Sequence, residues 1–211
     1  MKRISILRKP LGYSFSNVTL YLIAANILVF ALSYIFPRIE RLLALNAAAM
    51  LSGALWQPFT YMFVHANLSH LLVNMLGLFF FGTAVERSMG SREFLLFYLL
   101  TGLLAGLASF AIYALSGAWY SLLVGASGAV FALLLAFAIV NPDANIYLYG
   151  IIPVRAPVLV LGYAGIEIAS QVFSFRTGVA HLTHLAGFAW AWLYFLVRFG
   201  INPAKRMFRR R

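Results

Sequence analysis

The chain of 211 residues has no cysteine and only five acidic residues. The absence of cysteine excludes a disulfide framework, zinc sites with thiolate ligands and a cysteine nucleophile. Charged residues make up only 10% of the sequence, whereas hydrophobic residues make up 63%. A soluble domain is typically about 45–50% apolar and about 25% charged. The composition therefore excludes a water-soluble fold and indicates a membrane protein of one domain, or at most two.

Long apolar runs separated by short polar breaks predict six membrane-spanning helices. A spanning helix needs about 20 residues, within a range of about 17–25, and only the fourth run is shorter than that. The first run is not expected to be a cleavable signal peptide, because its apolar core is too long and no small-x-small pattern follows it. The six runs cover residues 17–36, 68–85, 94–115, 127–140, 157–175 and 179–197.

The predicted fold is an all-α polytopic membrane protein with a six-helix membrane domain over residues 17–200. A basic segment precedes it at 1–16, and a basic tail follows it at 201–211. The segment 37–64 between the first two helices is unusually long and mixes apolar residues with few charges. We expect it to lie at the membrane interface as short helices, with Trp56 as an amphipathic anchor.

The basic residues predict the orientation of the chain. If the N-terminus is cytoplasmic, 13 of the 16 Lys and Arg residues lie inside, and only Arg38, Arg41 and Arg176 lie outside. This asymmetry favours two cytoplasmic ends, with a basic tail that touches anionic lipid rather than nucleic acid. The plasma membrane of a bacterium is the simplest location for a chain of this size without additional domains.

Four polar residues are expected at a similar depth in the bilayer, namely His70, Asn74, Ser127 and His184. A polar side chain inside the bilayer costs free energy, so the presence of each one needs a structural or functional explanation. The even-numbered helices run from outside to inside, so all four residues lie near the outer ends. The fourth helix, which ends at Val140, is about 21 Å long, whereas the hydrocarbon core is about 30 Å thick. Ser127 is therefore expected at the floor of a water-filled cavity that opens outward.

Each of these residues also has an ordinary structural explanation. A serine at the start of a helix can be a cap, and His184 can make a hydrogen bond between helices. His70 and Asn74 are spaced i, i+4 on one helix face and can form a polar contact with a neighbour. Gly187 and Ala191 form a small-xxx-small face that lets the sixth helix pack closely. If it packs on the fourth helix, the histidine comes within reach of the serine.

Considered together, the four residues favour acyl transfer. A serine becomes nucleophilic when a histidine takes its proton, and amide or imidazole N–H groups can stabilise an oxyanion. Glu167 is placed midway along the fifth helix, near the bilayer centre, where it would be neutral or hydrogen-bonded to another helix. A Ser127/His184 dyad is therefore favoured over a triad with a carboxylate. His65 and His181 receive no assigned role.

The sequence resembles the rhomboid family of intramembrane serine proteases over about residues 17–200, including the six-helix order and the long first external loop. The resemblance is carried by Gly125-Ala126-Ser127-Gly128, His65-x4-His70-x3-Asn74, His184-Leu185-Ala186-Gly187, and Ala84-Val85-Glu86-Arg87 with Gly90 after it. It implies a rhomboid-like six-helix bundle whose short fourth helix starts at Ser127.

The resemblance implies that Ser127 is the nucleophile and His184 its general base. His70, Asn74 and Gly125 would line the oxyanion and substrate site, helped by the backbone N–H of Ser127. The substrate would be a single-span membrane protein, cut within or beside its transmembrane segment after lateral entry past the fifth helix. No cofactor and no metal is expected.

Three positions depart from the family pattern. Gln57 follows Trp56 where an arginine is usual, which puts a loop-stabilising interaction in doubt. Phe131 stands in place of a frequent tyrosine, and Ala191 in place of a frequent glycine. None of these changes removes a catalytic group.

Two alternatives come from other classes of function. One is a catalytically inactive rhomboid-like protein that binds membrane clients. The other is a transporter or metal carrier that uses its histidines, since His181 and His184 share a helix face. Missing carboxylate and thiolate ligands, and the lack of an apparent polar pathway across the inner half, argue against the second. The sequence makes no prediction for the oligomeric state.

Overall fold

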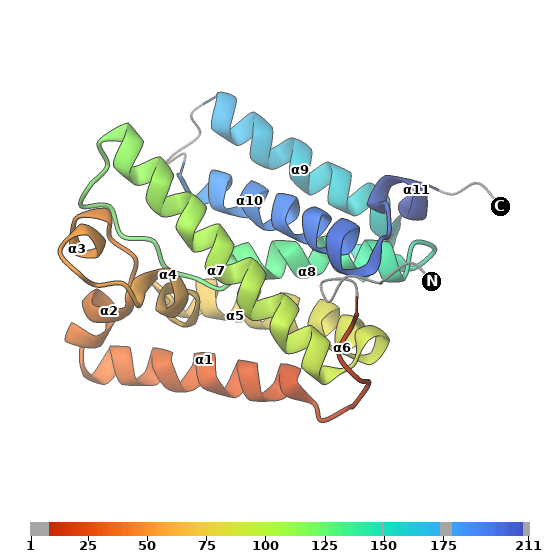
Figure 1. Ribbon diagram of the computed structural model, residues 1–211, viewed down its shortest axis with the longest axis horizontal. Coiled ribbons are helices and arrows are strands. Elements are labelled where there is room, and N and C mark those ends of the chain that lie inside the picture. Colours follow the sequence, from red (N-terminus) through yellow and green to blue (C-terminus); the bar gives the residue numbers. More distant parts are fainter. Residues whose placement is uncertain (1–8, 149, 174–178, 209–211) are drawn as a thin grey trace.

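The computed structural model describes residues 9–148, 150–173 and 179–208 and is predominantly helical (Figure 1). Predictions for residues 1–8, 174–176 and 209–211, Arg176 among them, fall outside the described residues. All six predicted runs coincide with helices. These helices are α1 (Val18–Ile35), α5 (Leu68–Gly77) continued by the π-helix η3 (Leu78–Gly82) and α6 (Thr83–Met89), α7 (Ser91–Ser116), α8 (Ser127–Val140), α9 (Ala156–Val172) and α10 (Val179–Tyr194) continued by the π-helix η4 (Phe195–Phe199).

Among the described residues, three helical segments are long and apolar enough to cross a membrane, at Val18–Ile35, Leu68–Met89 and Ser91–Ser116. The helices α8 and α9 are apolar but shorter. The shortness of α8 was predicted, because the apolar run after Ser127 ends at Val140. A short helix α11 (Pro203–Met207) lies in the segment predicted as the basic tail.

Between α1 and α5 the chain forms α2 (Arg38–Leu43), α3 (Ala47–Leu51), α4 (Gln57–Thr60) and the 3-10 helix η2 (Tyr61–Phe63). These short helices gather at one end of the bundle, on the left in Figure 1. Gln57 is buried, and its Oε1 accepts a hydrogen bond from the backbone N–H of Asn46 at 3.0 Å. The adjacent Trp56 Nε1–H donates to the Leu42 carbonyl at 2.9 Å. Glutamine therefore stabilises this loop without the usual arginine.

Helix α8 is the central helix, and α7, α9 and α10 pack against it (Figure 1). Most of its residues are buried. Gly187 of α10 lies directly against the backbone of α8, so a Cβ at this position would collide with the carbonyl oxygen of Gly128. The small-residue face of α10 therefore packs on α8, as expected for the sixth and fourth predicted helices. The first turns of α10 lie beside the start of α8.

The segment 117–126 between α7 and α8 is attached to the loop region before α5. Leu45 and Leu123 form an antiparallel bridge with N···O distances of 3.0 and 2.9 Å. The N–H of Gly125 donates to the carbonyl of Tyr61 at 3.0 Å. The end of this segment, from Leu123 to Ala126, is largely buried, and these backbone bonds satisfy polar groups there. They also fix where α8 begins.

A β-hairpin connects α8 to α9, and the all-α prediction missed it. Its strands are β1 (Asn145–Leu148) and β2 (Ile152–Arg155), with Asn145 opposite Arg155. Gly150 takes a positive φ of 74° in the turn. The residues around this glycine are mainly β-branched or aromatic, which favours strands, but the run is too short to produce a clear periodic signal.

Glu86 joins the start of α1 to the corner between α6 and α7. Its carboxylate accepts hydrogen bonds from the N–H groups of Val18 at 2.7 Å and Thr19 at 2.9 Å, and from the Ser91 hydroxyl at 2.5 Å. The first N–H groups of a helix lack partners within the helix, and an anion there is also favoured by the helix dipole. The Ala84–Arg87 motif therefore acts as a distant cap for α1.

Glu93 makes a second junction at the same end of the bundle. Its carboxylate accepts hydrogen bonds from Arg198 Nε at 2.7 Å, from the Tyr194 hydroxyl at 2.5 Å and from the Leu11 N–H at 2.7 Å. The first turn of α7 is thereby tied to the end of the α10 segment and to the chain before α1.

Candidate active site

Ser127 and His184 meet across the contact between α8 and α10. The Ser127 hydroxyl oxygen lies 2.8 Å from Nε2 of His184. The N-cap position of α8 belongs to Ala126, so the serine hydroxyl bonds across to α10 instead of capping its own helix. Both residues are partly exposed. A hydroxyl in contact with an imidazole nitrogen is the arrangement that general-base activation of a nucleophile requires.

The ring of His184 is stacked on Phe131, one turn after Ser127 on α8. The ring centroids are 4.2 Å apart and the planes differ by only 5°. Phe131 is itself packed edge-on against Tyr163 and Phe188. Phe131 therefore provides a flat packing surface for the ring of His184.

Glu167 of α9 lies against the other side of His184. Its Oε1 is 3.0 Å from Nδ1 of His184, and its Oε2 is 2.5 Å from Nδ1 of His181. The side chain of Glu167 is only 8% exposed. The expected hydrogen bond of Glu167 to another helix is therefore present, and it places a carboxylate beside the second ring nitrogen of His184, a contact that the sequence analysis did not predict.

The contact between Glu167 and His184 depends on the lateral placement of α9 beside α10, which the sequence pattern does not give. Glu167 lies three residues after the middle of α9 at Ala164 and five residues before its end at Val172. At that level it meets the first turns of α10. A signal was present in the sequence, because a carboxylate in an apolar helix needs donors, and His181 and His184 offer two on one helix face.

The close approach of Gly125 to His70 places the start of α5 beside Ser127. Gly125 has a positive φ of 119°, and a Cβ there would lie 2.7 Å from both Nε2 and Cε1 of His70 and 3.7 Å from the Ser127 hydroxyl. Only glycine fits both the backbone conformation and the space. The tip of the His70 ring therefore lies beside Ser127, while Asn67 caps α5 by accepting from the His70 N–H at 2.8 Å.

Asn74 lies one turn after His70 on α5 and is buried. Its side-chain amide donates to the backbone carbonyl of His70 at 2.9 Å. An amide has two N–H donors, so this bond within the helix uses one of them. The structure thus gathers Ser127, His184, His70 and Gly125 closely, with Asn74 in the next turn behind His70.

His65 precedes α5 and packs behind His70. The two rings are 5.1 Å apart and meet edge-on at 67°. Burial, together with the nearby His70 ring, lowers the pKa of His65 to about 4. His65 is therefore neutral at physiological pH and supports the position of His70 by packing.

The cluster of one carboxylate and two imidazoles has the donors of a metal site. Glu167, His181 and His184 each offer one ligand atom within 4.8 Å of the others, and such donors suit zinc. Both Nδ1 atoms are, however, already hydrogen-bonded to the carboxylate. The histidines considered as a possible metal set thus divide into two places, with His65 and His70 at α5 and the other two beside Glu167.

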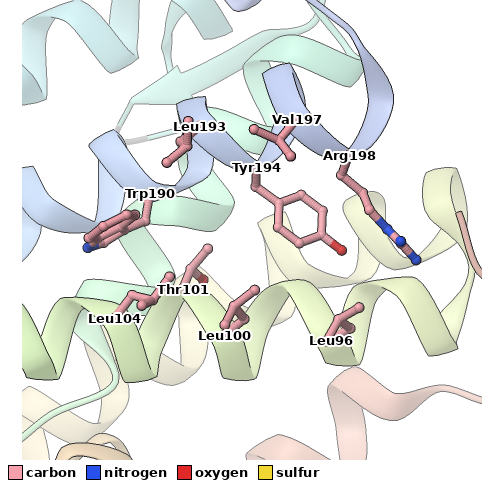
Figure 2. Close-up of a pocket in the computed structure, with 9 residues that line it drawn as sticks. All are labelled: Leu96, Leu100, Thr101, Leu104, Trp190, Leu193, Tyr194, Val197 and Arg198. Atoms are coloured by element: carbon pink, nitrogen blue, oxygen red, sulfur yellow. The ribbon is translucent and has the colours of Figure 1, made fainter. Parts of the chain in front are cut away.

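A separate cavity of about 250 Å³ lies between α7 and α10. Figure 2 shows side chains of the two helices facing one another there, including Leu100, Trp190 and Tyr194. Its lining is largely apolar, and none of the residues gathered around Ser127 contributes to it. This cavity is therefore distinct from the candidate active site.

The family model described as Rhomboid domain matches residues 52–201. The chain is 34% identical to RHOMBOID-like protein 12, mitochondrial, of Arabidopsis thaliana over 201 residues, covering 86% of the chain and 59% of that protein.

Two bacterial relatives are named proteases. Rhomboid protease GluP of Bacillus subtilis (strain 168) is 38% identical over 122 residues, or 55% of the chain and 23% of that protein. Rhomboid protease GlpG of Enterobacter sp. (strain 638) is 29% identical over 178 residues, or 81% of the chain and 59% of that protein. The chain spans less than two thirds of the length of each of these relatives. With a family match over most of its length and helices apolar enough to cross a bilayer, the chain is an integral membrane protein that belongs to the rhomboid family.

Proposed function

We propose that this protein is an intramembrane serine endopeptidase that cleaves transmembrane segments of other membrane proteins near the outer face of the bilayer. The observation that carries the proposal is the 2.8 Å contact between the Ser127 hydroxyl and His184 Nε2. Relatives named rhomboid proteases support the reaction class.

In the acylation step, Ser127 Oγ forms a bond to the scissile carbonyl carbon while its proton passes to His184 Nε2. The carbonyl electron pair moves onto the oxygen, which gives a tetrahedral oxyanion. Collapse of this intermediate breaks the C–N bond, and the proton on Nε2 passes to the leaving amine nitrogen. The N-terminal part of the substrate is then an ester of Ser127.

In the deacylation step, water attacks the ester carbonyl as His184 Nε2 takes a water proton. The C–O bond to Ser127 breaks, and the same proton returns to the serine oxygen. The products are a carboxylic acid and the restored serine. The partial exposure of both side chains supports access by water.

His70, Asn74 and the backbone N–H of Ser127 are the proposed oxyanion donors. The close approach of the His70 ring to Gly125, beside Ser127, supports this role for His70. Asn74 retains a second amide N–H for it, after the one that bonds to the His70 carbonyl. Donors held ready for a developing charge are a large source of rate acceleration.

The proposed arrangement in the membrane has six spans and two cytoplasmic ends, with single-span membrane proteins entering laterally beside α9. In Figure 1, α2, α3 and α4 gather at one end of the bundle, whereas the start of α1 and α11 lie at the other. The basic Lys205 and Arg206 of α11 favour a cytoplasmic position for that end. Two of the three relatives compared are bacterial, so we propose a bacterial plasma membrane.

Labelling with a fluorophosphonate tests the proposed nucleophile. The purified wild-type protein should form one covalent adduct, and Ser127→Ala protein should form none. Ser88→Ala is a matched control, because its hydroxyl bonds only to the Ala84 carbonyl of its own helix among the contacts described for it. A wild-type protein that stays unlabelled yet co-purifies with membrane clients would favour the inactive, client-binding alternative.

His184→Ala separates the base from the nucleophile. Removal of the imidazole should abolish both labelling and cleavage of a reporter with one transmembrane segment, since the serine then lacks a proton acceptor. The variant should remain folded, which its thermal unfolding in detergent checks, and inserted, which its recovery in the membrane fraction checks. Full cleavage by this variant would remove His184 from the mechanism.

A further inference from the structure

We propose that Glu167 is a positioning residue for His184, so that the site works as a serine–histidine–glutamate triad rather than as a two-residue dyad. This inference rests on the proposed function. It starts from one buried carboxylate on α9 whose two oxygens meet the Nδ1 atoms of His184 and His181 at 3.0 and 2.5 Å.

The first argument concerns the tautomer of His184. A carboxylate can only accept hydrogen bonds, so the Nδ1 atom that faces Glu167 carries the proton. In a neutral imidazole the other nitrogen, Nε2, then has a free lone pair. That atom is the one 2.8 Å from the Ser127 hydroxyl. Glu167 therefore selects the form of His184 that can accept the serine proton.

The second argument concerns the orientation of the ring. Stacking on Phe131 fixes the plane of the His184 ring, but a half-turn about the Cβ–Cγ bond preserves that plane. Such a turn would place a carbon where Nε2 meets Ser127. The hydrogen bond from Nδ1 to Glu167 distinguishes the two orientations, and stacking does not. The two contacts are thus complementary.

The third argument concerns charge. When Nε2 takes the serine proton, the ring becomes a cation next to the Glu167 carboxylate. The hydrogen bond between them then becomes charge-assisted on both sides and strengthens as the reaction proceeds. An interaction that is stronger in the transition state than in the ground state raises kcat.

His181 explains why the carboxylate stays in place. It lies one turn before His184 on α10, and its Nδ1 holds Oε2 of Glu167. With both oxygens engaged, the carboxylate cannot rotate away without losing two hydrogen bonds. His181 thus orients Glu167, which in turn orients His184.

Glu167→Gln tests the inference with a side chain of almost the same shape. We expect kcat for a transmembrane reporter to fall about 10- to 100-fold, the loss typical of one charge-assisted hydrogen bond. KM and thermal stability should stay unchanged, and the rate of fluorophosphonate labelling should fall with kcat. An unchanged kcat in an active protein would overturn the role of Glu167.

A matched variant separates positioning from general packing. Ser109→Ala removes a buried hydroxyl contact at 2.6 Å between α7 and Thr183, the residue next to His184. It should leave kcat unchanged. If Ser109→Ala lowers kcat as much as Glu167→Gln does, then any contact that holds α10 in place has the same effect on turnover. The specific role of Glu167 would then be excluded.

A spectroscopic measurement does not depend on activity. The chain has four histidines, so ¹⁵N-histidine labelling gives a simple spectrum in which His184→Ala identifies the His184 signals. The wild type should show His184 protonated at Nδ1, and Glu167→Gln should shift it toward a mixture of tautomers. A wild-type ring protonated at Nε2 would overturn the inference even if the protein proves to be inactive as a protease.

Zinc analysis of the same preparations tests the competing use of this cluster. Metal-free protein with full kcat is the expected result. One zinc ion per chain that is lost together with activity in Glu167→Gln would overturn the hydrogen-bonded arrangement, because the three side chains would then serve as ligands.

Discussion

Buried carboxylates at the two ends of the bundle have different partners. At the end where α1 begins, Glu86 and Glu93 bind backbone N–H groups, hydroxyls and an arginine. At the level of the candidate site, Glu167 binds two imidazoles. All three are almost fully buried, although the sequence has only five acidic residues.

The difference separates structure from chemistry. Donors such as backbone N–H groups and arginine do not lose their protons at physiological pH, so the first two carboxylates can only hold the helices together. An imidazole can accept and release a proton during a reaction, so the carboxylate beside it can influence that reaction. Variants at the first end should therefore change stability, and variants at the second should change turnover.

Glu86→Ala should give the largest loss of stability. It leaves the N–H groups of Val18 and Thr19 and the Ser91 hydroxyl without their carboxylate in an apolar surrounding. Each unsatisfied buried donor costs about 1–3 kcal/mol, so for three donors we expect a loss of at least about 3 kcal/mol in unfolding experiments with SDS. Turnover per folded molecule should stay at the wild-type value. A large fall in that turnover would break the contrast between the two ends.

Asn74→Ala should affect turnover instead of stability. If its amide stabilises the oxyanion, the loss is about 2.7–4 kcal/mol, or roughly 100- to 1000-fold in kcat. Asn26→Ala is the matched control, because Asn26 makes the same bond to the carbonyl one turn earlier, at 2.7 Å, within α1. Equal effects of the two variants on reporter cleavage would exclude a specific role for Asn74.

Gly125→Ala should lower kcat about 10- to 100-fold, because a displacement of about 1 Å in an active site has this size of effect. The added Cβ would press on the His70 ring and strain the backbone at φ 119°. Gly117→Ala introduces the same kind of strain at φ 77° in open space. Both should lose about 1–2 kcal/mol of stability, but only the first should lose turnover in the reporter assay.

Asp143→Ala should have the smallest effect. Its carboxylate pairs with Arg155 at 2.8 Å beside the hairpin, but the two side chains are 55% and 58% exposed. Exposed ion pairs contribute about 0–1 kcal/mol, so the unfolding midpoint and kcat should barely change. A loss comparable to that of Glu86→Ala would show that burial does not decide the importance of these acids.

Much of the fold could be predicted because apolar run length directly reflects helix length in a bilayer. The position of Ser127 at the start of a short α8 and the close packing at Gly187 followed from runs and small residues alone. A similar depth for His70, Ser127 and His184 was predicted because alternate helices share a direction, whereas contact of Ser127 with His184 was expected only if the sixth helix packs on the fourth.

The rest depends on how neighbouring helices are placed laterally, which periodicity does not encode. The contact between Glu167 and His184 needs α9 to face α10 at one particular level. The hairpin after α8 needs pairing between two four-residue strands. Gln57 could not be assigned a partner, because the Asn46 N–H that donates to its Oε1 comes near it only when the loop is folded.

The backbone pairing of Leu45 with Leu123, and of Tyr61 with Gly125, has a consequence for sequence variation. Main-chain bonds do not depend on side-chain identity, so many substitutions between these points should leave the start of α8 in place. A single inserted or deleted residue in the same stretch would shift the pairing and move the serine away from its histidine. The chain between α1 and α5 should therefore tolerate changes of residue far better than changes of length.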